Sequence, residues 1–145
     1  MNVKVVVADD HPGALQKSVS LLEGEFLVVA AAKNAQSVLE CVKRHRPDVV
    51  VLDLEMPVHN GIEIARKLGE MASPPAVVFC SAETKLDIVE SARQSGAMGY
   101  VYKMNMSRDL VKAVKSAAEG QPFVSSPWRG PGIQRRYPEL LCIFK

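Results

Sequence analysis

The run Val49–Leu52 constrains the fold of this chain most, because four apolar residues follow one another with no polar residue between them. A strand with one solvated face alternates polar and apolar residues, whereas an unbroken apolar run indicates a strand covered on both faces. Strands of this kind are typical of a parallel sheet between two layers of helices. The sequence therefore favours an α/β fold.

Short β-branched runs alternate with amphipathic segments along most of the chain. The runs predict strands at residues 3–8, 26–31, 48–53, 75–80 and 98–102. Apolar residues spaced by three and four predict helices at residues 12–23, 35–45, 61–70, 84–94 and 107–119. Asn60 is the predicted N-cap of the helix at residues 61–70, and Ser107 is the predicted N-cap of the helix at residues 107–119. Because parallel strands need crossover helices, we expect a doubly wound (βα)5 fold with a five-stranded parallel sheet.

Composition and charge fit one globular domain. The chain has 145 residues, 48% of them hydrophobic and 23% charged, with a net charge of +2. Residues 1–127 carry 14 basic and 15 acidic side chains, whereas residues 128–145 carry four basic and one acidic. We expect a domain at residues 1–127, followed by a basic tail or linker at residues 128–145 that forms no separate domain.

Several other classes of protein are disfavoured. The near-neutral charge argues against a generally basic nucleic-acid-binding surface. The apolar run at the N-terminus is too short for a signal peptide, and no run is long enough to span a bilayer. The three cysteines show no C-x-x-C spacing, which indicates buried thiols in a reducing compartment. These features predict a cytoplasmic protein without membrane contact.

Reactive side chains stand at the carboxyl ends of the predicted strands, which meet at one edge of an open α/β sheet. Asp9 and Asp10 end the first strand, Asp53 the third, Ser81 the fourth and Lys103 the fifth. Clustered carboxylates repel one another, and Mg²⁺ or Mn²⁺ relieves that repulsion. A metal, an ammonium and a hydroxyl around one point can hold a phosphoryl group. Asp53 is the predicted nucleophile, because it ends the most buried strand.

These motifs resemble the receiver domain of two-component response regulators, whose CheY-like, flavodoxin-like sheet has the strand order 2-1-3-4-5. The resemblance covers residues 3–127 and rests on four segments, which are Asp9-Asp10-His11-Pro12, Asp53-Leu-Glu-Met-Pro-x-x-Asn60-Gly61, Phe79-Cys80-Ser81-Ala82 and Gly99-Tyr100-Val-Tyr-Lys103. The first segment, and a Lys103 not followed by proline, are similar to the receivers of LuxR/NarL-type regulators, which usually carry a helix-turn-helix domain.

The resemblance implies a phosphorylation site that depends on a metal ion. Asp53 would accept a phosphoryl group from a sensor histidine kinase or a phosphotransfer protein. Asp10, Asp53 and the backbone carbonyl of Glu55 would bind Mg²⁺, or Mn²⁺, directly, and Asp9 would bind it through water. The domain would catalyse its own phosphorylation and dephosphorylation and is not expected to be an enzyme in any other sense.

The resemblance also implies a conformational output. Ser81 and Lys103 would contact the phosphoryl oxygens, and Tyr100 would be the switch aromatic that turns inward as Ser81 moves. The partner would be a downstream effector protein or a second copy of the chain. With 18 residues after the predicted domain, no helix-turn-helix domain and no direct DNA binding are expected from this chain.

Alternatives stay open at this level. The chain also fits a truncated LuxR/NarL-type regulator. It fits less well a haloacid-dehalogenase-like phosphatase, which usually carries Asp-x-Asp on its first strand, or an FMN-binding flavodoxin-like protein, whose phosphate loop it lacks. Single residues have structural interpretations too: Ser81 as a helix cap, Tyr100 as a fixed packing aromatic, and His11 as a loop or first-turn histidine beside Pro12.

Overall fold

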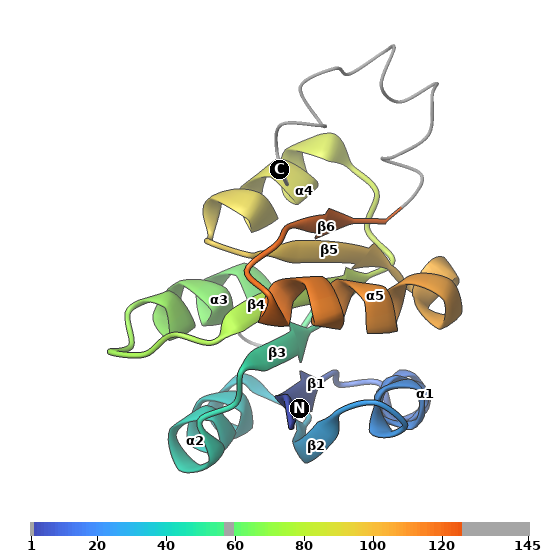
Figure 1. Ribbon diagram of the computed structural model, residues 1–145. Coiled ribbons are helices and arrows are strands. Elements are labelled where there is room, and N and C mark those ends of the chain that lie inside the picture. The colour runs from blue at the N-terminus through green and yellow to red at the C-terminus, as the bar shows by residue number, and fades with distance from the viewer. Residues whose placement is uncertain (1, 57–59, 126–145) are drawn as a thin grey trace.

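A computed structural model describes residues 2–56 and 60–125 and contains one parallel sheet with helices on both faces (Figure 1). The strand order is β2-β1-β3-β4-β5-β6. The strands are β1 (Lys4–Ala8), β2 (Leu27–Ala32), β3 (Val49–Leu52), β4 (Ala76–Ser81), β5 (Gly99–Tyr102) and β6 (Phe123–Val124). The helices are α1 (Pro12–Glu23), α2 (Ala35–His45), α3 (Gly61–Gly69), α4 (Leu86–Gln94), α5 (Met106–Ala118) and the short 3₁₀ helix η1 (Lys103–Asn105).

Alternate residues of the central strands feed two hydrophobic cores. Val50 and Phe79 point toward the core formed with α2, α3 and α4. Val51 and Val78 point toward the core formed with α1 and α5. All four residues of β3 are at most 2% exposed. The double-sided burial inferred from the run Val49–Leu52 is therefore confirmed, as is the strand order 2-1-3-4-5.

The sheet has one strand more than the five predicted. After α5, Gly120 adopts a left-handed backbone with φ of 74°, and the chain returns along the sheet. Phe123 and Val124 then pair in parallel with Gly99 and Tyr100 of β5. A strand of two residues is too short to show any periodicity, so the sequence pattern could not reveal it.

Two helix starts also differ from the prediction. The helix α4 begins at Leu86 rather than residue 84, because the Glu83 carboxylate accepts hydrogen bonds from the backbone N–H groups of Thr84 and Lys85. Ser81 therefore does not cap this helix. The helix α5 begins at Met106, directly after η1, so the predicted cap Ser107 lies inside it.

Other local predictions are confirmed. The helices α1 and α2 have the predicted bounds, with Pro12 at the first turn of α1. Asn60 caps α3 by accepting a hydrogen bond of 3.0 Å from the backbone N–H of Glu63. Gly96, with φ of 99°, follows the end of α4. The sequence pattern thus predicts the helix bounds best where a proline or a polar cap marks the start.

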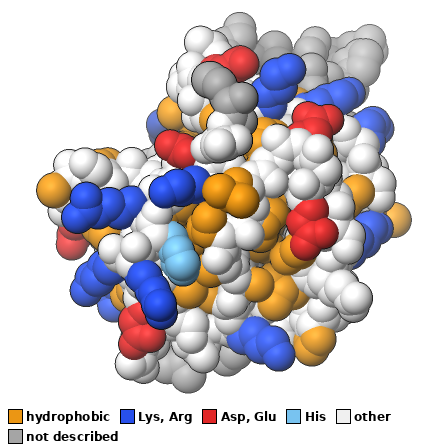
Figure 2. Space-filling model, turned by 60° about the horizontal axis from the view of Figure 1, so that its bottom comes forward, with side chains coloured by type: hydrophobic (Ala, Val, Ile, Leu, Met, Phe, Trp, Pro, Cys, Tyr) orange, Lys and Arg blue, Asp and Glu red, His pale blue; other side chains and the backbone are white. Residues whose placement is uncertain are grey.

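The outer surface agrees with the mixed charge of the sequence. On the face seen in Figure 2, Lys and Arg side chains are interspersed with Asp and Glu. Among the described residues, none of the helices has the length and apolar character to cross a membrane. The predicted tail at residues 128–145 lies outside the described residues, so its boundary with the domain stays a prediction.

Candidate functional site

Two buried carboxylates lie side by side at the carboxyl ends of β1 and β3. Ala8 and Leu52 pair across these neighbouring strands, and the backbone N–H of Asp53 donates a hydrogen bond of 3.0 Å to the carbonyl of Ala8. Asp9 and Asp53 therefore leave the sheet at the same level, and each is 3% exposed. Asp10, which is partly buried, follows in the same loop.

Lys103 supplies the positive charge of this cluster. It begins η1 at the end of β5, and its Nζ lies 2.9 Å from Asp9 Oδ2 and 3.2 Å from Asp53 Oδ2. The side chain is 20% exposed, so the cation is largely withdrawn from water. The structure thus brings together Asp9, Asp53 and Lys103 as the strand-end pattern predicted.

Burial is the main influence on the ionisation of Asp53. Loss of solvation raises the pKa of its carboxyl, the Lys103 charge lowers it, and the Asp9 charge raises it again. The net result is a pKa of about 6, compared with the ordinary 3.8. Burial lowers the pKa of Lys103, but its bonds to Asp9 and Asp53 prevail and raise that pKa above its ordinary value. One ammonium therefore only partly offsets the charge of the cluster.

The donor set fits a hard divalent cation. One ligand atom from each of Asp9, Asp10, His11 and Asp53 lies within 4.8 Å of the others. Asp10 Oδ1 is buried and makes no hydrogen bond with any of the described residues. Carboxylate oxygens are the ligands that such a cation prefers, and its charge would stabilise both this oxygen and the neighbouring Asp53 carboxylate. The acidic cluster predicted from the sequence is therefore present.

His11 belongs to this cluster, although the sequence assigned it only a place beside Pro12. It occupies the N-cap position of α1, as expected of a loop histidine. Its Nδ1 lies 3.3 Å from Asp9 Oδ1, 3.1 Å from Asp10 Oδ1 and 4.0 Å from Asp53 Oδ2. The signal available in the sequence was its position directly after two aspartates.

Ser81 and Tyr100 are joined through the loop between β4 and α4. Ser81 is 1% exposed, and its Oγ accepts a hydrogen bond of 3.0 Å from the backbone N–H of Glu83. The hydroxyl of Tyr100 donates a 2.8 Å hydrogen bond to the carbonyl of Glu83. Burial raises the pKa of this phenol above its ordinary value, so the hydroxyl stays a donor. Tyr100 points inward, with its ring centroid 6.3 Å from that of Phe79.

Glu55 contacts the cluster through its backbone. Its N–H donates a hydrogen bond of 3.2 Å to Asp53 Oδ1, which orients that carboxylate.

Next to Ser81, burial raises the pKa of Cys80 to about 12, so this thiol is neutral and unsuited to nucleophilic attack.

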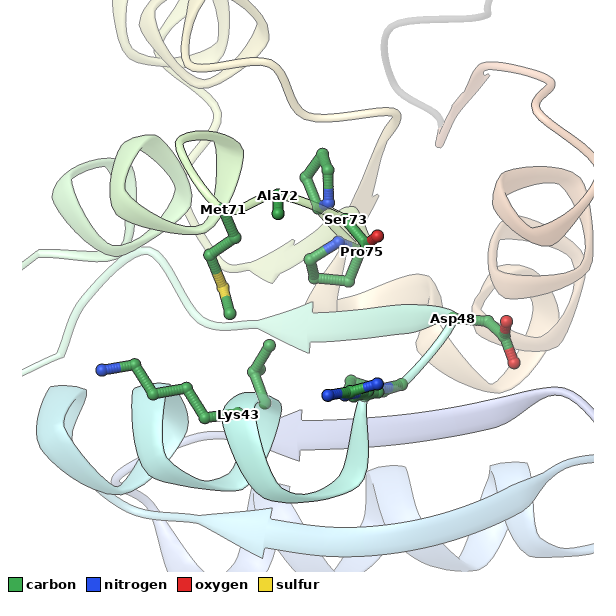
Figure 3. Close-up of a pocket in the computed structure, with 10 residues that line it drawn as sticks. Lys43, Asp48, Met71, Ala72, Ser73 and Pro75 are labelled. Atoms are coloured by element: carbon green, nitrogen blue, oxygen red, sulfur yellow. The ribbon is translucent and has the colours of Figure 1, made fainter.

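A cavity of about 640 Å³ lies at the opposite edge of the sheet, between α2 and the segment that connects α3 to β4 (Figure 3). Lys43 and Met71 are among its lining residues, and Asp48 and Pro75 stand just before β3 and β4. None of the predicted site residues lines it. The carboxylate cluster is therefore separate from this cavity.

The sequence matches the family model of the response regulator receiver domain over residues 5–115. The chain belongs to the response regulator receiver family. Receiver domains are signalling modules that interact with histidine kinases and effector domains, and phosphorylation of an aspartate is typical of them. The receiver assignment leaves no support for the phosphatase and flavin-binding alternatives.

Similar proteins place this receiver near the NarL type. It is 37% identical over 125 residues to the transcriptional regulatory protein NarL of Mycobacterium tuberculosis, covering 85% of this chain and 58% of that protein. It is 35% identical over 119 residues to the positive alginate biosynthesis regulatory protein of Pseudomonas aeruginosa, covering 80% and 47%. The structure of the receiver domain of M. tuberculosis NarL matches with a TM-score of 0.79, covering 83% of this chain and 98% of that domain. The chain spans about half the length of these curated relatives.

Proposed function

We propose that Asp53 is the phospho-acceptor of this receiver domain. The observation that carries the proposal is the contact of the buried Asp53 carboxylate with Lys103 within an acidic cluster that fits a divalent cation. Asp9, whose Oδ2 lies 2.9 Å from Lys103 Nζ, contributes a fixed negative charge to that cluster. Asp53 keeps Oδ1 bonded to the Glu55 N–H, which orients the carboxylate for attack through its other oxygen.

The reaction transfers a phosphoryl group from a phosphohistidine of a sensor kinase or phosphotransfer protein. An Asp53 carboxylate oxygen forms the new P–O bond while the P–N bond to the histidine breaks. The electron pair of that bond stays on the imidazole, which takes up a proton from solvent. Attack of water on the acyl phosphate later restores the carboxylate and releases inorganic phosphate.

Asp10, Asp53 and the backbone carbonyl of Glu55 are the proposed direct ligands of Mg²⁺, or Mn²⁺, with Asp9 bound through water. When bound, the metal ion supplies positive charge that offsets the carboxylates and the incoming phosphoryl oxygens. The buried Asp10 Oδ1, which lacks a hydrogen bond from the described residues, supports this assignment. His11 Nδ1 lies 3.1 Å from the same oxygen.

Ser81 and Lys103 are the proposed contacts of the phosphoryl oxygens, and Tyr100 is the proposed switch residue. Lys103 Nζ already lies 3.2 Å from Asp53 Oδ2. If Ser81 turns its hydroxyl toward the phosphoryl group, it loses the hydrogen bond from the Glu83 N–H, and the Glu83 carbonyl that holds Tyr100 moves with the loop. This linkage supports a conformational output to a downstream effector or a second copy of the chain.

Output through DNA is a second proposal, suggested by the M. tuberculosis relative, which is named as a transcriptional regulatory protein. The cytoplasmic location expected from the sequence stays a prediction.

Intact mass after incubation with acetyl phosphate and Mg²⁺ tests the phospho-acceptor. We expect a gain of one phosphoryl group, which a chelator prevents and which Asp53→Asn lacks. Asp48→Asn, at the other edge of the sheet, is the matched control and should be phosphorylated like the parent. Equal labelling of Asp53→Asn would overturn the assignment.

A further inference from the structure

A second buried carboxylate, Asp109 of α5, lies outside the cluster at the carboxyl ends of β1 and β3. Asp109 is 3% exposed and Ser125 is fully buried. The Ser125 hydroxyl donates a hydrogen bond to Asp109 Oδ2, and Arg108 Nε lies 3.0 Å from Asp109 Oδ1. The pair joins α5 to the residue that follows β6, 16 positions later in the chain.

Ser125 is also bonded to the strand of the proposed switch residue. Its backbone N–H donates a hydrogen bond of 2.8 Å to the carbonyl of Tyr100. Just before it, Val124 of β6 pairs with Tyr100 of β5, and the two strands lie side by side in Figure 1. Ser125 therefore holds the end of the described chain against both α5 and β5.

The charge of Asp109 makes this contact more than apolar packing. Burial raises the pKa of Asp109, but the hydrogen bonds from Arg108 and Ser125 prevail, so the pKa falls below its ordinary value. The carboxyl is thus ionised at neutral pH. A buried carboxylate without hydrogen-bond partners destabilises the folded state. The stability of the contact between α5 and the chain after β6 therefore depends on the Ser125 hydroxyl.

We propose that Asp109 and Ser125 form a positioning pair that fastens the chain leaving β6 to the strand of Tyr100, and so passes movement of Tyr100 to the residues after 125. The inference rests on the proposed function. Its physical route is three hydrogen bonds connected through Glu83 and Tyr100. The Glu83 N–H donates to Ser81 Oγ, the Tyr100 hydroxyl donates to the Glu83 carbonyl, and the Ser125 N–H donates to the Tyr100 carbonyl.

The sequence provides a reporter for that test. Trp128, the single tryptophan of the chain, stands three residues after Ser125. The full chain is incubated with acetyl phosphate and Mg²⁺, phosphorylation is measured by intact mass, and Trp128 emission is followed in the same samples. We expect the parent to change its emission as the phosphorylated fraction rises.

Ser125→Ala and Asp109→Asn should be phosphorylated to the parent's extent but lose at least two-thirds of the Trp128 response. Ser125→Thr, which keeps the hydroxyl, should restore it. Ser107→Ala on the exposed face of α5 is the matched control and should respond fully. Hydrogen exchange at the Ser125 amide gives a second measurement, and we expect phosphorylation to change its exchange rate in the parent at least threefold.

The outcomes separate the two proposals. Absence of a mass gain in the parent overturns the proposed function, and the inference with it. Normal phosphorylation with a full Trp128 response in both Ser125→Ala and Asp109→Asn overturns the inference alone. The inference alone is also overturned if the parent is phosphorylated but neither Trp128 emission nor the Ser125 exchange rate changes. If the alanine variant does not fold, the same comparison is made between Ser125→Thr and Asp109→Asn.

Discussion

Lys103 Nζ lies 3.2 Å from Asp53 Oδ2, although the two residues are 50 positions apart in the sequence. Lys103 also contacts Asp9, so it is the shared counter-ion of two buried carboxylates. Removing one partner of a buried ionic group leaves the other charge uncompensated. The stability of the metal-free protein should therefore depend on this ammonium.

Lys103→Met tests that dependence. We expect the free energy of unfolding at neutral pH, without divalent cations, to fall by about 1–3 kcal/mol, because Asp9 and Asp53 then repel each other without a counter-charge. Urea unfolding measures the difference. Lys33→Met, at an exposed lysine after β2, is the control and should lie within about 0.5 kcal/mol of the parent. A Lys103→Met protein as stable as this control would show that the ion pair contributes nothing.

Asp53→Asn should stabilise the metal-free protein. The carboxyl has a pKa of about 6 when folded and 3.8 ordinarily, so between these values the folded protein holds a proton that the unfolded chain releases. The free energy of unfolding therefore falls as the pH rises from about 4 to about 6, and it stays lower above that range. Asn cannot ionise, so we expect the variant to exceed the parent by up to about 3 kcal/mol at neutral pH.

Thermal unfolding of parent and variant across this pH range provides the measurement for Asp53→Asn. The two stability profiles should converge as the pH falls below 3.8, because the Asp53 carboxyl of the parent is then protonated in both the folded and the unfolded state. Parallel profiles over the whole range would mean that Asp53 is not the group with the raised pKa.

The sequence predicted the parts of the site that depend on strand ends. Asp9, Asp53 and Lys103 follow apolar runs whose length and order specify a parallel sheet, and the topology of such a sheet brings their side chains to one edge. His11 was predicted only to be a loop or first-turn histidine beside Pro12, because its approach to the carboxylates depends on the conformation of the loop between β1 and α1. Nothing in the spacing of residues connects Asp109 with the chain after β6, and a strand of two residues carries no periodic signal.

Mg²⁺ at a millimolar concentration should raise the melting temperature of the parent. A ligand that binds only the folded state stabilises it by mass action, by about 2.7 kcal/mol when its concentration is one hundred times the dissociation constant. Asp10→Ala removes the buried oxygen that lacks a hydrogen bond from the described residues, so the shift should be lost or strongly reduced. Asp87→Ala, at an exposed carboxylate of α4, should keep the full shift. An unchanged shift in Asp10→Ala would place the metal elsewhere.

Gly61 sets the distance between α3 and the loop that carries Asp53. Its N–H donates a hydrogen bond of 2.8 Å to the carbonyl of Leu54. A Cβ at this position would collide with the backbone carbonyl of Asp53 and would lie 2.9 Å from Leu54 Cα and 3.0 Å from Phe79 Cε1. Two of these three obstacles are backbone atoms, which cannot rotate away, so Gly61→Ala must displace the loop.

We expect Gly61→Ala to lower the free energy of unfolding by about 1–3 kcal/mol, as overpacking usually does, and to slow phosphorylation by acetyl phosphate at least tenfold. Gly69→Ala in the same helix is the matched control, because a Cβ there meets nothing within 4 Å. Alanine also has the higher helix propensity, so this control should gain up to about 1 kcal/mol and be phosphorylated normally. Urea unfolding and the rate of mass gain check both variants. A Gly61→Ala protein that is destabilised yet phosphorylated at the parent's rate would show that the glycine serves packing only and does not position Asp53.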